Sequence, residues 1–365
     1  MIGRIPVRNL WLLMLYASDL YRDCGKQMAS AETAPDEIPA LIARMLSEAT
    51  ERRLHRSLTS GYLDREANLN RLRGRIDLLK TTRHRLLSKG QVACRFSEMT
   101  LNTPRNCYIR SALEKLGQLL KDKSEGRHCR SLAYRLYQSG VTGDKPDSSF
   151  LSRETFSRHD ADDRQLVSLS RLAFDLALPS EEQGRYQTQA PDRSATFVRK
   201  LFEKAVAGLY KVALRPEGWT VKAGKAFQWP IEQRTAGIAE ILPGMKTDIE
   251  LSRPGHHIVI DTKFTHILSK GWYREKTLRS GYLYQMYAYL RSQEKTESPD
   301  SMYSTGILLH PCTGEPLNES VTIQGHSIRF VTVDLTASAC EIRELLLTVV
   351  RDESPVPYDV IPKQG

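Results

Sequence analysis

An aspartate and a lysine stand two residues apart at the end of an apolar segment in the second half of the 365-residue chain. The segment His257–Phe264 reads HIVIDTKF, so a run typical of a buried strand ends in Asp261 and Lys263. Because side chains alternate between the two faces of a strand, Asp261 and Lys263 point to the same face, roughly 7 Å apart along the strand. The sequence therefore predicts that both side chains belong to one site.

A second aspartate lies at the spacing of a hairpin. Asp248 belongs to the strand-like segment Lys246–Leu251, which the turn Ser252–Gly255 joins to the segment of Asp261. On a shared face, Asp248 and Asp261 could bind Mg²⁺, which prefers hard oxygen ligands and leaves positions for water and a substrate phosphate. Lys263 could hold and polarise the attacking water in phosphodiester hydrolysis. The alternative is that this Asp-x-Lys pattern is only a solvated strand edge.

Glu203 could add a third carboxylate to the metal. It lies in the amphipathic segment Ala195–Tyr210, away from the centre of the apolar stripe of that predicted helix. The alternative is an ordinary surface ion pair with Arg199, four residues earlier.

Gln285 and Tyr289 are spaced i, i+4 in the predicted helix Tyr282–Arg291 and therefore share one helical face. RecB-like nucleases use such a pair to brace the active site and touch DNA. Tyr289 could equally be an ordinary core residue.

Other kinds of catalytic site have little support. His256 and His257 fall in the predicted turn and are expected to be solvated loop residues. The sequence has no phosphate-binding glycine motif and no GxSxG nucleophile motif. The cysteines are scattered without any CxxC pair, which argues against zinc, an iron–sulfur site or a disulfide framework and is typical of cytosolic thiols: Cys24, Cys94, Cys107, Cys129, Cys312 and Cys340.

The charge of the chain suits a polyanionic partner such as nucleic acid. The formal net charge is +10, and residues 51–90 hold eleven Lys or Arg against four Asp or Glu, a net of +7. No segment has the roughly 18 consecutive apolar residues of a membrane span. We therefore expect a cytoplasmic protein that does not interact with membranes.

The order of predicted elements indicates an α/β protein of two domains. Residues 1–185 are expected to be mainly helical with some strands, and Asn9 is a plausible N-cap of the first helix. The polar segment Pro179–Ser194 resembles a connector, which puts the boundary near residue 185. Residues 186–365 are expected to form a mixed central sheet flanked by helices.

These motifs resemble those of the McrC family, nuclease subunits of the McrBC modification-dependent restriction systems that act on 5-methylcytosine. The nuclease motifs also resemble the PD-(D/E)xK superfamily, although Thr247 stands where proline often precedes the first acid. The resemblance is found in both halves of the chain, in Ile5–Leu10, Leu13–Ala17, Gly74–Asp77, Leu201–Lys204, Met245–Asp248, Val259–Lys263, Leu283–Met286 and Tyr289–Leu290.

The resemblance implies an endonuclease that works with a partner, the AAA+ GTPase McrB. In this family the partner ring binds GTP, recognises modified cytosine and moves double-stranded DNA, whereas McrC stimulates GTP hydrolysis and cuts. The N-terminal domain inserts into the ring, which offers a second role for the basic segment Arg52–Lys89. By position, Asp248 and Asp261 would be metal ligands, Lys263 the catalytic lysine, and Glu203 and Gln285 supporting residues.

Two other functions are compatible with the same residues. One is a stand-alone RecB-like repair nuclease that needs no partner. The other is a non-catalytic adaptor that activates the GTPase and keeps a vestigial nuclease fold. Intact Asp248, Asp261 and Lys263 argue against the adaptor.

Overall fold

A computed structural model describes residues 5–24, 34–121, 123–147, 149, 156, 161–185, 191–269, 276–295, 299–312 and 316–351. The chain divides into two compact units. One comprises residues 39–180, and the other comprises residues 1–38 together with residues 181–365. Each is described by itself below.

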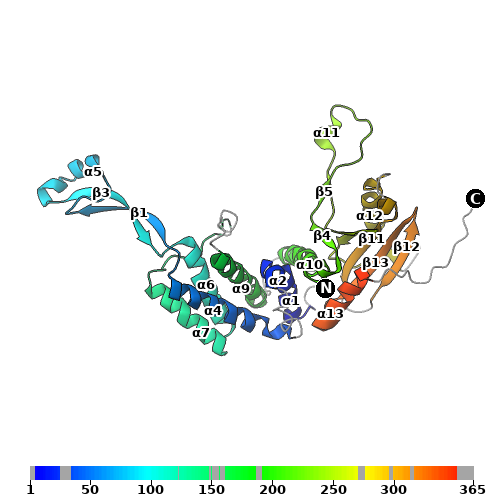
Figure 1. Ribbon diagram of the computed structural model, residues 1–365, viewed down its shortest axis with the longest axis horizontal. Coiled ribbons are helices and arrows are strands. Elements are labelled where there is room, and N and C mark those ends of the chain that lie inside the picture. The colour runs from blue at the N-terminus through cyan, green and yellow to red at the C-terminus, as the bar shows by residue number, and fades with distance from the viewer. Residues whose placement is uncertain are drawn as a thin grey trace, which may run out of the picture. The chain divides into compact units, whose positions relative to one another are not determined.

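The unit of residues 39–180 consists of packed helices and a projecting arm. Its helices are α4 (Ile38–Arg56), which begins at the boundary, α6 (Pro104–Leu119), α7 (Ser124–Gln138) and α9 (Ala161–Arg185), which continues beyond it. The arm contains strands β1 (Gly61–Leu69), β2 (Arg75–Ile76) and β3 (Val92–Thr100), in the sheet order β1-β3-β2, with the short helices α5 (Leu78–Arg83) and η4 (Leu86–Lys89) (Figure 1). Residues 61–100 are called the basic arm below.

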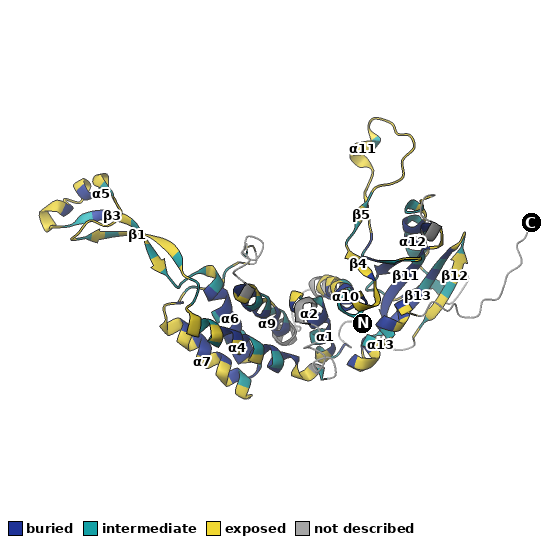
Figure 2. Ribbon diagram, viewed as in Figure 1, coloured by how far each residue is buried: buried dark blue, intermediate teal, exposed yellow. Residues whose placement is uncertain are grey.

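The basic arm has a charged and largely exposed surface (Figure 2). Three of its four acids form ion pairs: Arg95 lies 2.8 Å from Glu66 and 3.0 Å from Asp77, and Arg65 lies 3.1 Å from Glu98. Further basic side chains are exposed toward the far end, together with three leucines that are 70–86% exposed, namely Leu78, Leu79 and Leu87. Most of the charge of the predicted basic segment therefore lies on this arm.

The second unit is built on a mixed sheet, in which six strands have the order β12-β13-β11-β8-β7-β4 within the described residues. These strands are β4 (Thr220–Ala223), β7 (Ile249–Arg253), β8 (His256–Thr262), β11 (Thr305–Cys312), β12 (Asn318–Ile323) and β13 (His326–Asp334). Strand β11 is parallel to β8 and β13, and the other neighbours are antiparallel. Strand β8 is therefore buried between two neighbours, as its apolar sequence predicts.

The helices of this unit are α1 (Val7–Ala17), α2 (Asp19–Cys24), α10 (Pro191–Ala213), α11 (Ile238–Ile241), α12 (Ser280–Ser292) and α13 (Ala339–Arg351). Short 3₁₀ turns are η3 (Pro35–Glu37), η5 (Arg215–Glu217) and η6 (Pro299–Tyr303). Two small strand pairs lie outside the main sheet: β5 (Ala226–Phe227) with β6 (Met245–Lys246), and β9 (Leu268–Ser269) with β10 (Thr277–Leu278). No helix in the described ranges combines the length and apolar character that crossing a bilayer requires.

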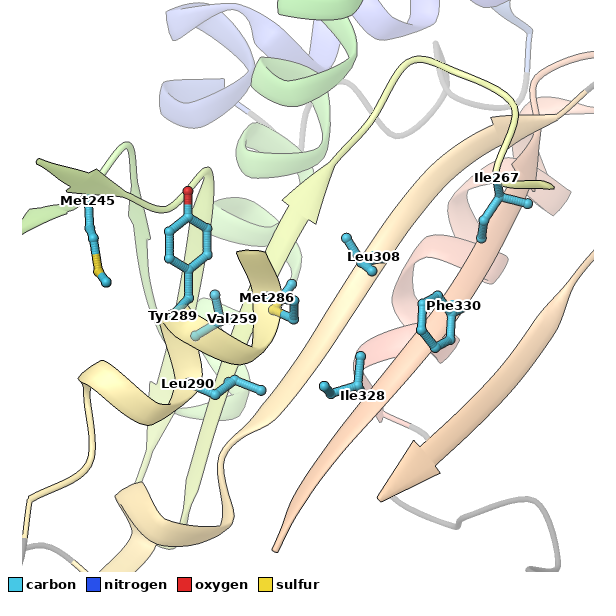
Figure 3. Packing of buried hydrophobic residues seen from close by; sticks show 9 residues of the cluster. All are labelled: Met245, Val259, Ile267, Met286, Tyr289, Leu290, Leu308, Ile328 and Phe330. Carbon is cyan, nitrogen blue, oxygen red and sulfur yellow. The ribbon is translucent and has the colours of Figure 1, made fainter. Parts of the chain in front are cut away.

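Helices cover both faces of the sheet. On one face, Met286 and Leu290 of α12 belong to the same buried cluster as Val259, Leu308 and Ile328 of the strands (Figure 3). Arg329, which alternates with Ile328, donates to the carbonyl of Val349 in α13 at 2.8 Å, so α13 covers the opposite face. The Tyr210 hydroxyl in α10 donates to the Leu346 carbonyl at 2.8 Å and ties α10 to α13.

Helix α1 packs against α10 and so belongs to the unit that holds the sheet. This differs from the predicted boundary, which assigned all of residues 1–185 to one domain. The expected N-cap role of Asn9 is wrong, because helix α1 begins at Val7 and Asn9 lies inside it. Asn9 is buried, and its amide donates to the carbonyl oxygens of Leu335 and Ala337 at 2.8 and 3.0 Å. The buried Asn9 side chain thus joins helix α1 to the segment that follows β13.

The expected connector is shorter than the sequence suggests. Helix α9 extends to Arg185 and α10 starts at Pro191, so helices occupy most of Pro179–Ser194. Residues 186–190 lie outside the described residues. The mixed α/β class and the predicted hairpin are confirmed: β7 and β8 are antiparallel and turn at Gly255, whose φ is +80°.

Gly208 permits the close approach of α1 to α10. A Cβ atom on Gly208 would lie 1.9 Å from the carbonyl oxygen of Tyr16, a main-chain atom that cannot rotate away. We expect Gly208→Ala to lower the free energy of unfolding by about 3 kcal/mol despite the better helix propensity of alanine. Urea denaturation would measure this. The control is Gly237→Ala, where an added Cβ meets open space; equal stability of the two variants would contradict the packing argument.

Candidate active site

Asp261 and Lys263 lie together at the end of β8, within the sheet rather than at its edge. The Lys263 ammonium donates to Oδ1 of Asp261 at 3.1 Å. It also lies 2.8 Å from Oδ2, without the alignment that a second hydrogen bond requires. Asp261 is 2% exposed and the Lys263 side chain 11%. The solvated-edge alternative is therefore wrong.

Burial changes the protonation behaviour of Asp261. Removal from water raises the pKa of this carboxyl to about 6, and the negative charge of Asp248 acts in the same direction. The neighbouring Lys263 ammonium lowers the pKa and offsets only part of the effect. Asp261 is thus a carboxylate held in an environment that favours its neutral form unless positive charge is supplied.

Asp248 immediately precedes β7 and lies close to Asp261. The register ends with the pair Ile249–Ile260, so position 248 lies beside the end of β8, where its charge acts on Asp261. Oδ2 of Asp248 accepts hydrogen bonds from the Thr262 backbone N–H at 2.8 Å and the Thr262 hydroxyl at 2.9 Å. Thr262, which the sequence did not single out, therefore fixes the orientation of the Asp248 carboxylate.

The two carboxylates have oxygens available to a cation. Among the described residues, Oδ1 of Asp248 has no hydrogen-bond partner, and the buried Oδ2 of Asp261 has none either, although the Lys263 ammonium lies 2.8 Å from it. Hard, negatively charged oxygens of this kind fit Mg²⁺. No three His, Cys, Asp or Glu side chains cluster as a ready-made metal site in the described ranges. Two ligands, rather than a closed protein cage, are what this arrangement offers.

Glu203 of α10 lies near enough to Asp248 for the two charges to interact. Burial raises the pKa of the Glu203 carboxyl, and the Asp248 charge raises it further. Glu203 is half-buried, and no ion pair with Arg199 forms in the part of the chain that the structure describes. The surface-pair alternative is therefore not observed. Whether Glu203 binds metal stays a prediction.

Gln285 and Tyr289 contact each other on α12, as their spacing predicts. The Gln285 amide donates to the Tyr289 hydroxyl at 2.6 Å. The Tyr289 ring packs in the core cluster, 5.9 Å from the Phe227 ring, and its hydroxyl points out of the cluster, away from Leu290 (Figure 3). The charges of Asp261, Lys263 and Asp248 all act on this hydroxyl. Tyr289 is thus a core residue whose polar end faces the site.

A buried polar network next to Asp248 is not evident from the sequence pattern. Glu250 accepts hydrogen bonds from Lys225 at 2.7 Å and from the Thr247 hydroxyl at 2.9 Å. Burial alone would raise the pKa of the Glu250 carboxyl, but His257, Lys225 and Thr247 together lower it to about 2. His257 lies 3.7 Å from Glu250 and contacts the Ser304 hydroxyl at 2.9 Å. The prediction that His256 and His257 are solvated turn residues is wrong, because both belong to β8.

Comparison with known proteins places this chain in a family. Residues 3–308 match the family described as McrBC 5-methylcytosine restriction system component. The chain belongs to the McrBC family. The resemblance inferred from the sequence motifs is thereby confirmed.

The McrBC-family chain has a curated relative, the "Type IV methyl-directed restriction enzyme EcoKMcrBC" of Escherichia coli (strain K12). The two are 24% identical over 352 residues, which cover 94% of this chain and 96% of the relative. A solved structure, the "Refined half-complex from tetradecameric assembly of Thermococcus gammatolerans McrB AAA+ hexamers with bound McrC", is 14% identical with a TM-score of 0.40, covering 86% of this chain and 68% of that chain. The "Cryo-EM structure of the Thermococcus gammatolerans McrBC complex" gives a TM-score of 0.29 at 14% identity, covering 43% and 51%.

The raised pKa of Asp261 makes stability depend on pH in this McrBC-family chain. The folded-state pKa of about 6 exceeds the ordinary value of 3.8, so the folded state binds this proton more tightly than the unfolded state. The associated stability is present below pH 3.8 and is lost as pH rises through 6, a total of about 3 kcal/mol. We expect Asp261→Asn to gain stability relative to the wild type between pH 4 and 7.5. Urea titrations without divalent cations would test this, and a pH-independent difference would contradict it.

Proposed function

We propose that this chain is the nuclease subunit of a GTP-dependent restriction complex that cleaves double-stranded DNA containing modified cytosine. The observation that carries the proposal is the buried Asp261–Lys263 pair beside Asp248 at the end of a central strand. This juxtaposition resembles the PD-(D/E)xK arrangement that the sequence motifs suggest. Family membership supports the restriction role.

In this proposal Asp248 and Asp261 would hold Mg²⁺, and Glu203 would add a further carboxylate. When bound, Mg²⁺ supplies Lewis-acid stabilisation to the scissile phosphate and its leaving group. The positive charge would also relieve the cost of burying the Asp261 carboxylate. Asp248 needs little rearrangement, because Thr262 already fixes the orientation of its other oxygen.

Lys263 holds and polarises the attacking water. Its ammonium is confined between Asp261 and the ring of Tyr282, whose centroid lies 5.3 Å from Nζ. A positioned charge of this kind, largely screened from bulk water, stabilises negative charge that develops on the phosphate oxygens. Gln285 and Tyr289 brace the site from α12 and present the Tyr289 hydroxyl toward the DNA.

The partner in this proposal is an AAA+ GTPase ring of the McrB type, which binds GTP and chooses the DNA. A related assembly is described as McrB AAA+ hexamers with bound McrC. The basic arm supplies a docking element, because exposed leucines and unpaired basic side chains lie together toward its end. Apolar side chains that are this exposed are typical of interaction surfaces. The same basic side chains would also contact DNA.

Two rival functions make different predictions. A stand-alone RecB-like repair nuclease would cleave DNA without any GTPase. A non-catalytic adaptor would stimulate the GTPase but show no carboxylate-dependent binding of Mg²⁺ or Mn²⁺, even with DNA and partner present. The buried and oriented carboxylates favour a working nuclease over the adaptor, since keeping them costs stability.

Asp248→Ala tests the cutting role. The purified chain would be combined with an AAA+ GTPase of the McrB type and assayed on methylated and unmethylated DNA with GTP and Mg²⁺. We expect loss of cleavage with partner binding and GTPase stimulation unchanged, because Asp248 lies far in sequence from the basic arm and supplies a ligand only. The control is Glu319→Ala, an exposed carboxylate on strand β12. Persistent cleavage by the Asp248→Ala complex would refute the site assignment.

A double variant, Leu78→Asp and Leu79→Asp, tests the docking role of the basic arm. Both side chains are exposed, at 70% and 86%, so the fold should tolerate the change. We expect at least about tenfold weaker binding to the GTPase ring, because charged side chains would replace apolar contacts. Sedimentation or interferometry would measure the affinity. Tyr134→Asp, an exposed aromatic on α7 of the same unit, is the control; equal affinities of all three proteins would place docking elsewhere.

A further inference from the structure

A fully buried histidine lies next to Lys263 and takes no part in the mechanism described above. His310 belongs to β11, and the register of β11 with β8 pairs Leu309 with Thr262. The Lys263 backbone N–H continues this pairing by donating to the Leu309 carbonyl at 3.0 Å. His310 therefore stands beside the residue that the proposal makes the catalytic lysine, on the face that carries Asp261 and Leu308.

One ring nitrogen of His310 holds the turn that follows Lys263. Nδ1 lies 2.9 Å from the carbonyl oxygen of Thr265 and must donate, since a carbonyl only accepts. The Thr265 backbone N–H in turn donates to the Lys263 carbonyl at 2.9 Å. Both ends of the Lys263–Thr265 turn are thus attached to β11, one through the main chain and the other through the His310 ring.

The rest of the His310 environment also surrounds Lys263. The Tyr282 ring lies 5.7 Å from the His310 ring, and its hydroxyl is 3.3 Å from Oγ1 of Thr265. The same ring lies beneath the Lys263 ammonium. His310, Thr265 and Tyr282 consequently form one packed group against the stem and the turn of Lys263.

The ring of His310 is neutral at physiological pH. Burial lowers the pKa of His310 to about 4, and the cations Lys263 and Arg279 lower it further. Nδ1 therefore carries the proton, and Nε2, which is buried, has no hydrogen-bond partner among the described residues. If His310 served only to fill space, an apolar side chain would do so without the free-energy cost of burying a polar nitrogen that makes no hydrogen bond.

We propose that His310 is a positioning residue for Lys263. Its Nδ1–H holds the Thr265 carbonyl, which fixes the Lys263–Thr265 turn and keeps the Lys263 ammonium at the Asp261 carboxylate. This inference rests on the proposed function, in which Lys263 acts on the attacking water. On this view, His310 of strand β11 keeps the ammonium of Lys263 in the position that the reaction requires.

Two amide variants of His310 separate positioning from packing. Asparagine places its N–H₂ close to the position of Nδ1 and can still donate to Thr265, whereas glutamine places the amide one bond further out, near Nε2. With the full-length chain, its GTPase partner, GTP and Mg²⁺, we expect His310→Gln to lower kcat by about 10- to 100-fold with KM for DNA nearly unchanged. His310→Asn should stay within about threefold of the wild type. His326→Asn, a buried histidine on β13 away from the site, controls for general destabilisation.

Amide hydrogen exchange provides a readout that needs no cleavage. The N–H groups of Lys263 and Thr265 should exchange faster in His310→Gln and at the wild-type rate in His310→Asn. If the wild type does not cleave DNA, the proposed function fails while the exchange comparison still decides the positioning role. Equal exchange and equal kcat in the Gln and Asn variants would overturn it, as would an equal kcat loss in both.

Discussion

The site depends on keeping the Asp261 carboxylate buried. A lone carboxylate in a sheet core is strongly disfavoured, so positive charge must be close, and Lys263 supplies it from the same strand face. The alternation of the strand then assigns the intervening residue a different task, because Thr262 turns to Asp248 and fixes it. Three consecutive residues at the end of β8 thus organise both carboxylates, and this requires that β7 and β11 flank β8 on either side.

The sequence was sufficient for the parts of the site that follow from local pattern. Asp261 and Lys263 interrupt an apolar run, and Asp248 lies one hairpin away, so period and spacing alone place them together. Other roles cannot be inferred from local pattern, because they depend on partners far along the chain. This holds for Thr262, Glu250, Lys225 and His310. A threonine or a glutamate in a strand has no local feature that distinguishes a buried, bonded side chain from a solvated one.

The contrast between local pattern and distant contacts also decides which parts of the fold are predictable. Long amphipathic helices follow from local periodicity, as the buried Ile342, Leu346 and Val350 of α13 show, and so does the β7–β8 hairpin. Strand β1 has no such signal, because its largely exposed side chains show no apolar alternation. Asn9 was misread for a related reason: near Pro6 it has the type of a helix cap, but its partners are Leu335 and Ala337 at the other end of the sequence. The position of α1 is decided by tertiary packing that no window of the sequence contains.

The segment between β4 and β7 is closed off at its base from the candidate site. Residues 225–247 leave the sheet and return to it, and hydrogen bonds join the two ends: Gly224 N–H to the Asp248 carbonyl at 2.8 Å, and Thr247 N–H to the Lys225 carbonyl at 3.0 Å. The closed base, anchored by Glu250, isolates Asp248 from whatever lies between. Since the entropy of closing a loop grows slowly with its length, residues 228–244 can be lengthened, exchanged or replaced by a whole domain during evolution while the positions of Asp248 and Asp261 are inherited unchanged.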